Sequence, residues 1–247
     1  LNGIDIDYWR DDIYKGKNID EKKLVELKKK KKEELINEIY KRCGKKLSKH
    51  KLIVVMPRRL SGQKGFDTIY PIIPDACKKL KFQFIMLGVA HPKDEIGKKW
   101  AEDFRKLSEE LREFVFIYAF DEKLAKLMYA GGDLILYPSL PNKEPCGTGY
   151  MMAMVNATPC LGTKTGGLAE CIQEFDEVLE TGNGFLVWKE EYSPRAFFEK
   201  FKKISKLYYR KKSKWNKLMW NSFNSNFDIK EAAKKYILKV YLPLTEI

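Results

Sequence analysis

The sequence predicts an α/β fold in which a parallel sheet is covered by helices on both faces. Short apolar runs, such as residues 52–56 and 82–87, have the length and the bulky side chains of buried strands. Longer charged stretches with apolar residues at helical spacing lie between these runs. Strands that alternate with helices are joined by crossover connections, so the pattern favours one Rossmann-like parallel sheet with helical extensions at both ends.

The expected elements alternate with some regularity along the chain. Strands are expected at residues 52–56, 82–87, 114–118, 133–137, near 159–161 and at 184–188. Helices are expected at residues 18–46, 66–80, 94–111, 121–130 and 151–157, with three more after the last strand. The run Lys28 to Lys32 is expected to be a solvated helix face. The predicted organisation is a lead-in segment with a charged helix at 1–46, followed by one domain at 47–247.

Charge and composition bound the function. The chain has 247 residues, enough for one large domain, and a formal net charge of +13. This excess suits either a polyanion partner or a lysine-rich solvated surface, and interleaved acidic residues favour the second. The aromatic residues lie mostly in apolar runs and form no base-stacking platform. We therefore expect no nucleic-acid partner.

Cysteine and histidine usage narrows the chemistry further. The five cysteines are widely spaced and include no C-x-x-C pair, which argues against a disulfide framework or a zinc site and favours a reducing compartment. Two histidines are too few for a histidine metal cluster. No apolar window approaches the length that crosses a bilayer, so no membrane partner is expected. A chain that begins with Leu1 rather than methionine is expected to be a fragment.

The stretch from Tyr137 to Tyr150 is the most informative part of the chain. It predicts a strand, a loop with the single acid Glu144, and a glycine-rich turn that starts a buried helix. Such a turn exposes unpaired backbone N–H groups to an anion. Glu144 cannot help to bind a phosphate, but it suits a neutral, hydroxyl-rich group beside one. A sugar joined to a diphosphate fits both features.

Three other loops belong to the same edge of the predicted sheet, because ligands bind at the carboxyl ends of parallel strands. Arg58, Arg59 and Lys64 follow the first strand and suit phosphate oxygens. Phe120 follows the third strand and suits a stacked base. The run Lys164-Thr-Gly-Gly-Leu168 follows the fifth and offers backbone amides. Together the loops predict a nucleotide-diphosphate site, while the absence of Gly-x-Gly-x-x-Gly and P-loop motifs disfavours nicotinamide enzymes and P-loop hydrolases.

These motifs resemble the C-terminal, nucleotide-sugar-binding half of bacterial and archaeal glycogen synthases and plant starch synthases. Six segments match in the family's order, and the resemblance runs through most of the chain. They are Asn2-Gly-Ile-Asp5 with Trp9, Arg59-Leu-Ser-Gly-Gln-Lys-Gly65, Phe120-Asp-Glu122 with Tyr129-Ala-Gly-Gly-Asp133, Pro138-Ser139 with Glu144-Pro-Cys-Gly147, Thr165-Gly-Gly-Leu168, and Thr181-Gly-Asn-Gly-Phe185.

The resemblance implies a retaining glycosyltransferase of the GT-B fold that extends α-1,4-glucan from ADP-glucose or UDP-glucose. It implies that Arg59 and Lys64 hold the diphosphate and stabilise its departing charge, and that Glu144 binds glucose hydroxyls. Phe120 would pack on the base. It also implies no metal or other cofactor, and a cytoplasmic location, or a plastid in a plant or alga. The remaining implied substrate-binding residues are Cys146, Gly147, Thr148, Gly149, Thr165, Gly166 and Gly167.

Some residues depart from the family pattern. The loop before Glu144 is longer than usual, and the residues after Gly147 resemble the cofactor helix of glycogen phosphorylases. The lysine that carries pyridoxal phosphate there is Met152 here, and methionine forms no Schiff base, so a phosphorylase is disfavoured. The N-terminal acceptor domain of a GT-B enzyme is absent from this chain. We therefore expect the isolated chain to bind nucleotide but to be nearly inactive in transfer.

Two alternatives remain open from the sequence. One is a related retaining transferase with another acceptor, such as a lipid or a protein glycan, which needs the same donor loops. The other is a non-catalytic scaffold of a carbohydrate complex, for which Arg59, Lys64 and Glu144 would be unimportant. Such a basic module would bind polyanions with a steep salt dependence.

Overall fold

The fold is organised around one six-stranded parallel sheet. The computed structural model describes residues 2–16 and 18–242. The strand order is β3-β2-β1-β4-β5-β6, and all five neighbouring pairs are parallel. The strands are β1 (Leu52–Pro57), β2 (Phe82–Leu87), β3 (Phe114–Ile117), β4 (Leu134–Tyr137), β5 (Cys160–Thr163) and β6 (Gly184–Val187). All six predicted strands are therefore present, and the predicted fold class is confirmed.

Alternate residues of the central strand enter two separate cores. On β1, Leu52, Val54 and Met56 pack into one hydrophobic cluster, whereas Ile53 and Val55 pack into the other. All of them are fully buried. Because helices cover both faces, a parallel strand of this kind has a continuous apolar sequence rather than an alternating one.

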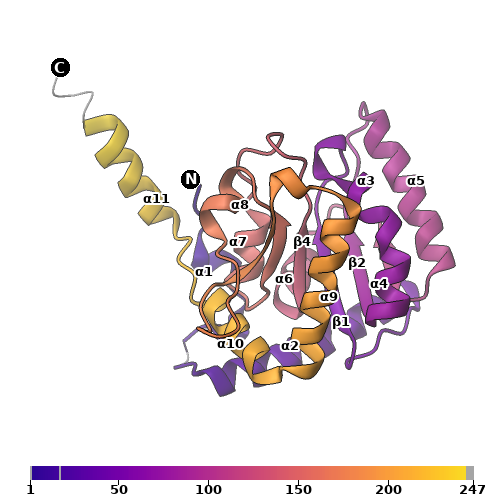
Figure 1. Ribbon diagram of the computed structural model, residues 1–247, viewed down its shortest axis with the longest axis horizontal. Helices are drawn as coiled ribbons and strands as arrows, with labels where there is room; N and C mark the ends of the chain where they lie inside the picture. The colour runs from indigo at the N-terminus through magenta and orange to yellow at the C-terminus, as the bar shows by residue number, and fades with distance from the viewer. Residues whose placement is uncertain (1, 17, 243–247) are drawn as a thin grey trace.

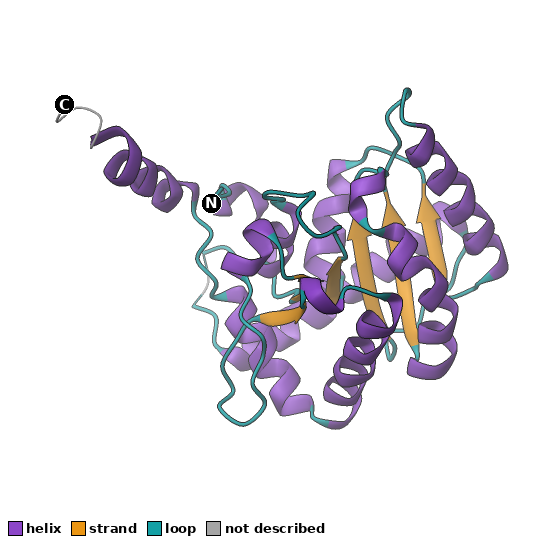
Figure 2. Cartoon of the chain, turned by 45° about the horizontal axis from the view of Figure 1, so that its top comes forward, coloured by secondary structure: helices purple, strands orange, loops and turns teal. Residues whose placement is uncertain are grey.

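Helices cover both faces of the sheet. Helices α4 and α9 contribute to one core, and α6 and α7 contribute to the other (Figure 1). Figure 2 shows the strands side by side with helices around them. The longer helices are α2 (Glu21–Cys43), α4 (Ile73–Leu80), α5 (Glu95–Glu110), α6 (Glu122–Gly131), α9 (Pro194–Arg210), α10 (Lys212–Phe223) and α11 (Ile229–Tyr236), and the shorter ones are α1 (Ile6–Trp9), α3 (Phe66–Ile69), α7 (Gly149–Met154) and α8 (Gly166–Cys171). Among the described residues, no helix is long and apolar enough to cross a membrane.

Prolines interrupt one helix that the sequence predicted to be continuous. Residues 66–80 form α3, a 3₁₀ turn and α4. Pro71 lies in the first turn of the 3₁₀ segment, and Pro74 lies in the first turn of α4. Proline has no N–H and its ring clashes with the preceding turn of a helix, so it is tolerated where a new helix begins but not in its interior.

Helix α2 is fastened to the sheet by two buried lysines. Lys28 Nζ donates hydrogen bonds to the carbonyl oxygens of Ala130 and Asn156, at 2.8 and 3.0 Å, and to the Thr158 hydroxyl. Lys32 Nζ lies 2.6 Å from Oδ2 of Asp133. The prediction that the Lys28 to Lys32 run is a solvated face is therefore wrong for these two residues.

Helical spacing explains the burial of these lysines. Residues 24, 28, 32 and 35 recur at intervals of three or four, so they lie on one face of the helix. Leu24, Leu35 and Ile39 are fully buried on that face. Lys28 and Lys32 are consequently directed inward, where carbonyl groups and Asp133 satisfy them, whereas their neighbours Lys29 and Lys30 are exposed.

The buried pair of Lys32 and Asp133 should matter for stability. The side chains of both residues are less than a tenth exposed. Asp133→Asn leaves the buried ammonium without its counter-charge, so we expect a loss of about 3 kcal/mol in the free energy of unfolding, measured by urea denaturation. Glu33→Gln removes an exposed pair with Lys49 and should cost less than about 1 kcal/mol. Equal losses in the two variants would show that the buried pair has no special role.

Candidate functional site

A cavity of about 550 Å³ opens at the carboxyl ends of the strands. It lies where the strand order reverses, because β1 pairs with β2 on one side and with β4 on the other. The chain runs from β1 outward through β2 and β3 and then returns to β4. Loops diverge at such a point, so an open parallel sheet has its natural crevice there.

The loop after β1 supplies three cations with different environments. Arg58 and Lys64 are buried, whereas Arg59 is exposed, and all three line the cavity. Lys64 ends a 3₁₀ turn and is followed by Gly65, whose φ is +69°. A Cβ on Gly65 would lie 1.7 Å from the carbonyl oxygen of Pro138, so only glycine allows this loop to approach the loop after β4.

Glu144 is the acid at the centre of the cavity, and three side chains donate to it. Lys64 Nζ donates to Oε1 at 2.5 Å, and Arg58 Nη2 donates to Oε2 at 2.7 Å. The Ser139 hydroxyl also donates to Oε2. The loops after β1 and β4, which are more than 70 residues apart in sequence, are therefore joined by one carboxylate.

The charges in this cluster shift each other's pKa. Burial raises the pKa of Glu144, but the Arg58 guanidinium and the hydrogen bonds from Lys64 and Ser139 more than offset it, so the pKa lies below its ordinary value. Burial, the Arg58 charge and, more weakly, the Arg59 charge lower the pKa of Lys64, against the opposing effect of Glu144. The carboxylate is thus held in its charged form.

Arg58 is clamped between a ring and the acid. Its guanidinium carbon lies 3.9 Å from the centre of the Tyr137 ring, and its side chain is 3% exposed. Its Nε and Nη1 atoms are buried and have no hydrogen-bond partner among the described residues. Stacking on an aromatic face compensates an arginine for lost hydration, so the Tyr137 ring offsets part of the cost of burying this guanidinium beside Glu144.

Aromatic side chains form the rim of the cavity. Phe120 lines it and is 90% exposed, so its ring is accessible for stacking against a planar group. Trp9 comes from the lead-in segment, and its ring centre lies 6.2 Å from that of Tyr129. Met152 also lines the cavity. Residues before position 47 therefore help to build the cavity.

The predicted glycine-rich turns have two different positions. Gly147, Thr148 and Gly149 line the cavity, together with Arg59, Lys64, Phe120 and Glu144 of the predicted set. The remaining four predicted residues lie outside the cavity lining and pack behind the Glu144 loop. They are Cys146, Thr165, Gly166 and Gly167.

The outer turn supports the loop that carries the acid. The Gly167 N–H donates to the carbonyl oxygen of Pro145 at 2.8 Å. Gly166 has a φ of +47°, and a Cβ on it would lie 2.4 Å from the same oxygen. The Thr165 hydroxyl accepts from the N–H of Asn142. These contacts hold the Glu144 loop in place. The predicted role of this turn in substrate binding stays a prediction.

Sequence reasoning named Arg58 as a candidate phosphate ligand but missed its contact with Glu144, and it missed Tyr137 altogether, because both depend on the direction that the fold gives the side chains. Arg58 and Arg59 are adjacent, so their side chains point to opposite sides of an extended chain, and the sequence does not say which one faces Glu144. The sequence places Tyr137 at the end of a strand and assigns it no role in the site. Tyr137 instead supports Arg58, and its hydroxyl oxygen would lie 2.3 Å from a Cβ on Gly149. No local signal distinguishes either residue.

Comparison with known proteins identifies the class. A family model described as glycosyl transferases group 1 matches residues 25–218. The chain belongs to this glycosyltransferase family, in agreement with the fold and with the cavity at the carboxyl edge.

Two curated relatives show which members of the family this chain resembles. The chain is 31% identical to a glycogen synthase of Mycoplasma mobile over 98% of its length and 48% of the relative's. It is 32% identical to one of Thermotoga petrophila, over 96% of this chain and 46% of that one. The chain thus spans about half the length of the curated relatives it matches. The resemblance to glycogen and starch synthases that the motifs predicted is confirmed.

A solved structure has the same fold. The catalytic domain of starch synthase IV from Arabidopsis thaliana, bound to ADP and acarbose, superposes with a TM-score of 0.77 and 26% identity. The match covers 96% of this chain and 47% of that one. The six-stranded sheet is therefore a Rossmann-like half of a GT-B fold.

The Arg58–Glu144 contact makes a prediction about titration. Arg58→Met removes the strongest opposition to burial, so the pKa of Glu144 should rise, as followed by carbon NMR of the carboxylate. In the unsubstituted chain the pKa of Glu144 is lower in the folded state than in the unfolded state. The contribution of Glu144 to stability is therefore fully present above the unfolded pKa, and it is lost as pH falls through the folded pKa. Arg59→Met is the matched control and should leave the Glu144 titration unchanged.

Proposed function

We propose that this chain is the donor-binding domain of a retaining glucosyltransferase that extends α-1,4-glucan from ADP-glucose or UDP-glucose. The observation that carries the proposal is one cavity in which three cations, one carboxylate held by two of them and an exposed aromatic ring meet at the carboxyl edge of the sheet. The family membership and the likeness to glycogen and starch synthases support it.

Arg59 and Lys64 would bind the diphosphate of the donor. Arg59 is exposed at the cavity and is therefore free to turn toward a phosphate, and Lys64 lies deeper beside it. Both charges would stabilise the negative charge that develops on the diphosphate as the glycosidic bond breaks. Phe120 at the rim would cover the base. The proposal covers either adenine or uracil as the base of the donor.

Glu144 would bind the hydroxyls of the glucose. An ionised carboxylate offers about four acceptor positions, so it can accept from sugar hydroxyls while it keeps bonds to its cations. Since the positive groups of the site hold it ionised, it stays an acceptor throughout. Backbone amides of residues 146–149 are proposed to cradle the distal phosphate and the sugar.

Lys64 would change partners when the donor binds. In this structure Lys64 Nζ donates to Glu144, so it must turn from the carboxylate to reach a phosphate. Arg58 remains on Oε2 of Glu144 and keeps that charge compensated while Lys64 moves. The two cations thus divide two tasks, one at the acid and one at the phosphate.

The acceptor glucan would bind mainly to a partner domain. The relatives are about twice as long as this chain, and the proposed acceptor half is the part that this chain does not cover. Two domains that close over the donor would expel water from the cavity. We propose a cytoplasmic location, or a plastid in a plant or alga.

The diphosphate site is tested by calorimetric titration with ADP, UDP and ADP-glucose at two salt concentrations. Saturable binding of one diphosphate is expected. Lys64→Ala should weaken it by roughly 1.5–3 kcal/mol, the range for a hydrogen bond to a charged group. Lys79→Ala, which removes an exposed charge on α4, is the control and should leave the affinity unchanged. Absence of any binding would argue against a donor site in this chain.

The role of Glu144 is tested by comparing two ligands. Glu144→Ala should weaken ADP-glucose, or UDP-glucose if that is the donor, by at least tenfold more than the matching diphosphate, because only the sugar nucleotide presents glucose hydroxyls to the acid. The same titration measures both ligands. Equal losses would remove Glu144 from the sugar site.

The division into two halves makes a prediction about activity. The isolated chain should bind the donor but transfer almost no glucose to a glucan primer, as measured by incorporation of labelled glucose. Robust elongation by the isolated chain would contradict the proposal that the acceptor site lies elsewhere.

A further inference from the structure

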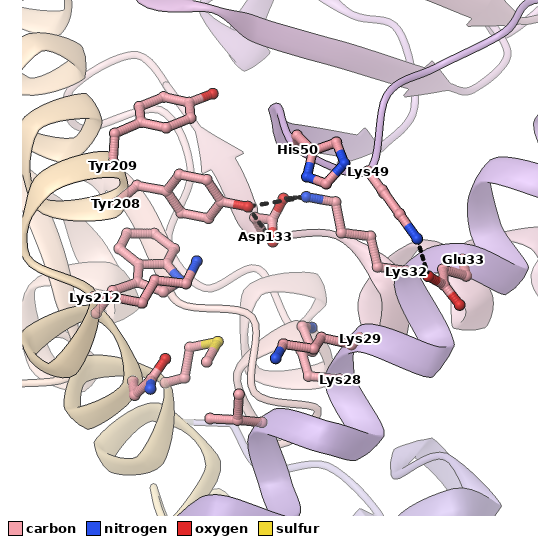
Figure 3. A pocket seen from close by; sticks show the side chains of 14 residues that line it. Lys28, Lys29, Lys32, Glu33, Lys49, His50, Asp133, Tyr208, Tyr209 and Lys212 are labelled. Carbon is pink, nitrogen blue, oxygen red and sulfur yellow. Dashed lines mark hydrogen bonds and ion pairs between the residues drawn. The ribbon is translucent and has the colours of Figure 1, made fainter.

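A second cavity, of about 450 Å³, lies at the opposite edge of the sheet. It is bounded by α2, by residues 49–50 before β1, by Asp133 before β4, and by the end of α9 with α10 (Figure 3). These are the amino ends of the strands. Because β1 has six residues, the two cavities are separated by about 20 Å of strand. The second cavity is therefore distinct from the donor cavity.

Lysines dominate the wall of this cavity. Five of its lining residues are lysines, and two are carboxylates. Lys28 and Lys32 are satisfied internally, and Lys49 pairs with Glu33 at 3.1 Å. Lys29 and Lys212 have no carboxylate within ion-pair distance in the described part of the chain. Figure 3 shows these two reaching in from opposite sides, one from α2 and one from α10.

The positive charges of the lysines in this cavity lie close together and repel one another. Burial lowers the pKa of Lys212, the Asp133 carboxylate opposes this effect, and the charges of Lys32 and Lys29 lower it further. Burial and, more weakly, Lys32 lower the pKa of Lys28 to about 7, again against Asp133. A bound anion would relieve this repulsion, since opposite charge favours the protonated form of each lysine.

Aromatic and polar groups complete the cavity. Tyr208 and Trp215 are buried and line it, and Lys212 lies 4.2 Å from the centre of the Tyr208 ring. The Oδ1 atom of Asn216, another lining residue, is buried and has no hydrogen-bond donor among the described residues. A buried acceptor without a partner is unusual, and a hydroxyl of a ligand would satisfy it after a small turn of the side chain.

We propose that this cavity binds a small phosphomonoester that also carries hydroxyl groups, such as a hexose monophosphate. Lys29 and Lys212 hold the phosphate between them from the two walls. The apolar faces of Tyr208 and Trp215 pack against the carbon skeleton, and Asn216 accepts from a hydroxyl. The volume lies within the range of small-molecule sites, and a concave wall suits a small anion better than a nucleic acid.

Titration calorimetry with fructose 6-phosphate tests the proposal. The experiment uses the Lys64→Ala chain, in which phosphate binding at the donor cavity is weakened. One-site binding is expected, and Lys29→Ala with Lys212→Ala should weaken it at least tenfold. Both residues are exposed, so the substituted chain should keep its fold, which its urea midpoint checks.

A matched pair of substitutions separates a site from general attraction. Lys22→Ala with Lys217→Ala removes the same charge from the same two helices, outside the cavity lining, and should change the affinity less than twofold. Equal weakening by the two pairs would overturn the proposal, because it would reduce the binding to nonspecific attraction. Failure of fructose 6-phosphate to bind at millimolar concentration would also overturn it.

Inorganic phosphate and fructose test the two halves of the ligand. Each should bind at least tenfold more weakly than fructose 6-phosphate, because each engages only part of the wall. If inorganic phosphate binds as tightly as the sugar phosphate, the contacts of Tyr208, Trp215 and Asn216 contribute nothing, and the cavity holds an adventitious ion only. That result would overturn the assignment to a hydroxylated phosphomonoester.

Discussion

The network of hydrogen bonds and ion pairs around Glu144 is the constraint on which the carboxyl edge of the sheet depends. A carboxylate that is this deeply buried is unfavourable unless cations compensate it. Arg58 and Lys64 do so from the loop after β1, and the turn at residues 165–167 supports the loop that carries the acid. The close approach of Gly65 to Pro138 allows these loops to meet. The shape of the cavity thus follows from the charge balance of one residue.

The same charge balance bears on the proposed exchange of partners at Glu144. In this structure Arg58 and Lys64 share one acid. With a diphosphate, the proposed exchange moves Lys64 to the phosphate while Arg58 keeps Glu144 compensated. Since no charge is left buried and unpaired at either stage, the exchange avoids the large cost of isolating an ion. Arg58 is buried and stacked on Tyr137, which suits a residue that stays paired with Glu144 throughout. Arg59 is exposed, which suits contact with an incoming ligand.

Buried cations lie at both edges of the sheet, and their charges are compensated in different ways. At the carboxyl edge, two buried cations surround one acid. At the amino edge, Lys28 and Lys32 bind carbonyl groups and Asp133, and they fasten α2 to the chain segments beside α6 and α7. Thr158, which accepts a hydrogen bond from Lys28, also donates to the carbonyl oxygen of Tyr129, a residue that lines the cavity at the carboxyl edge. Packed polar contacts therefore connect the two edges through the body of the domain.

The sequence by itself determined the class of fold, the strands and the loops of the site. Buried parallel strands are continuous apolar runs, and glycine-rich turns mark close backbone approach, so both are visible locally. Only the tertiary structure decided which side chains meet. Arg58 rather than Arg59 faces Glu144, Lys28 and Lys32 are buried, and Thr165-Gly-Gly supports a loop instead of lining the cavity. These outcomes depend on strand direction and helix rotation, which contacts between residues far apart in sequence set.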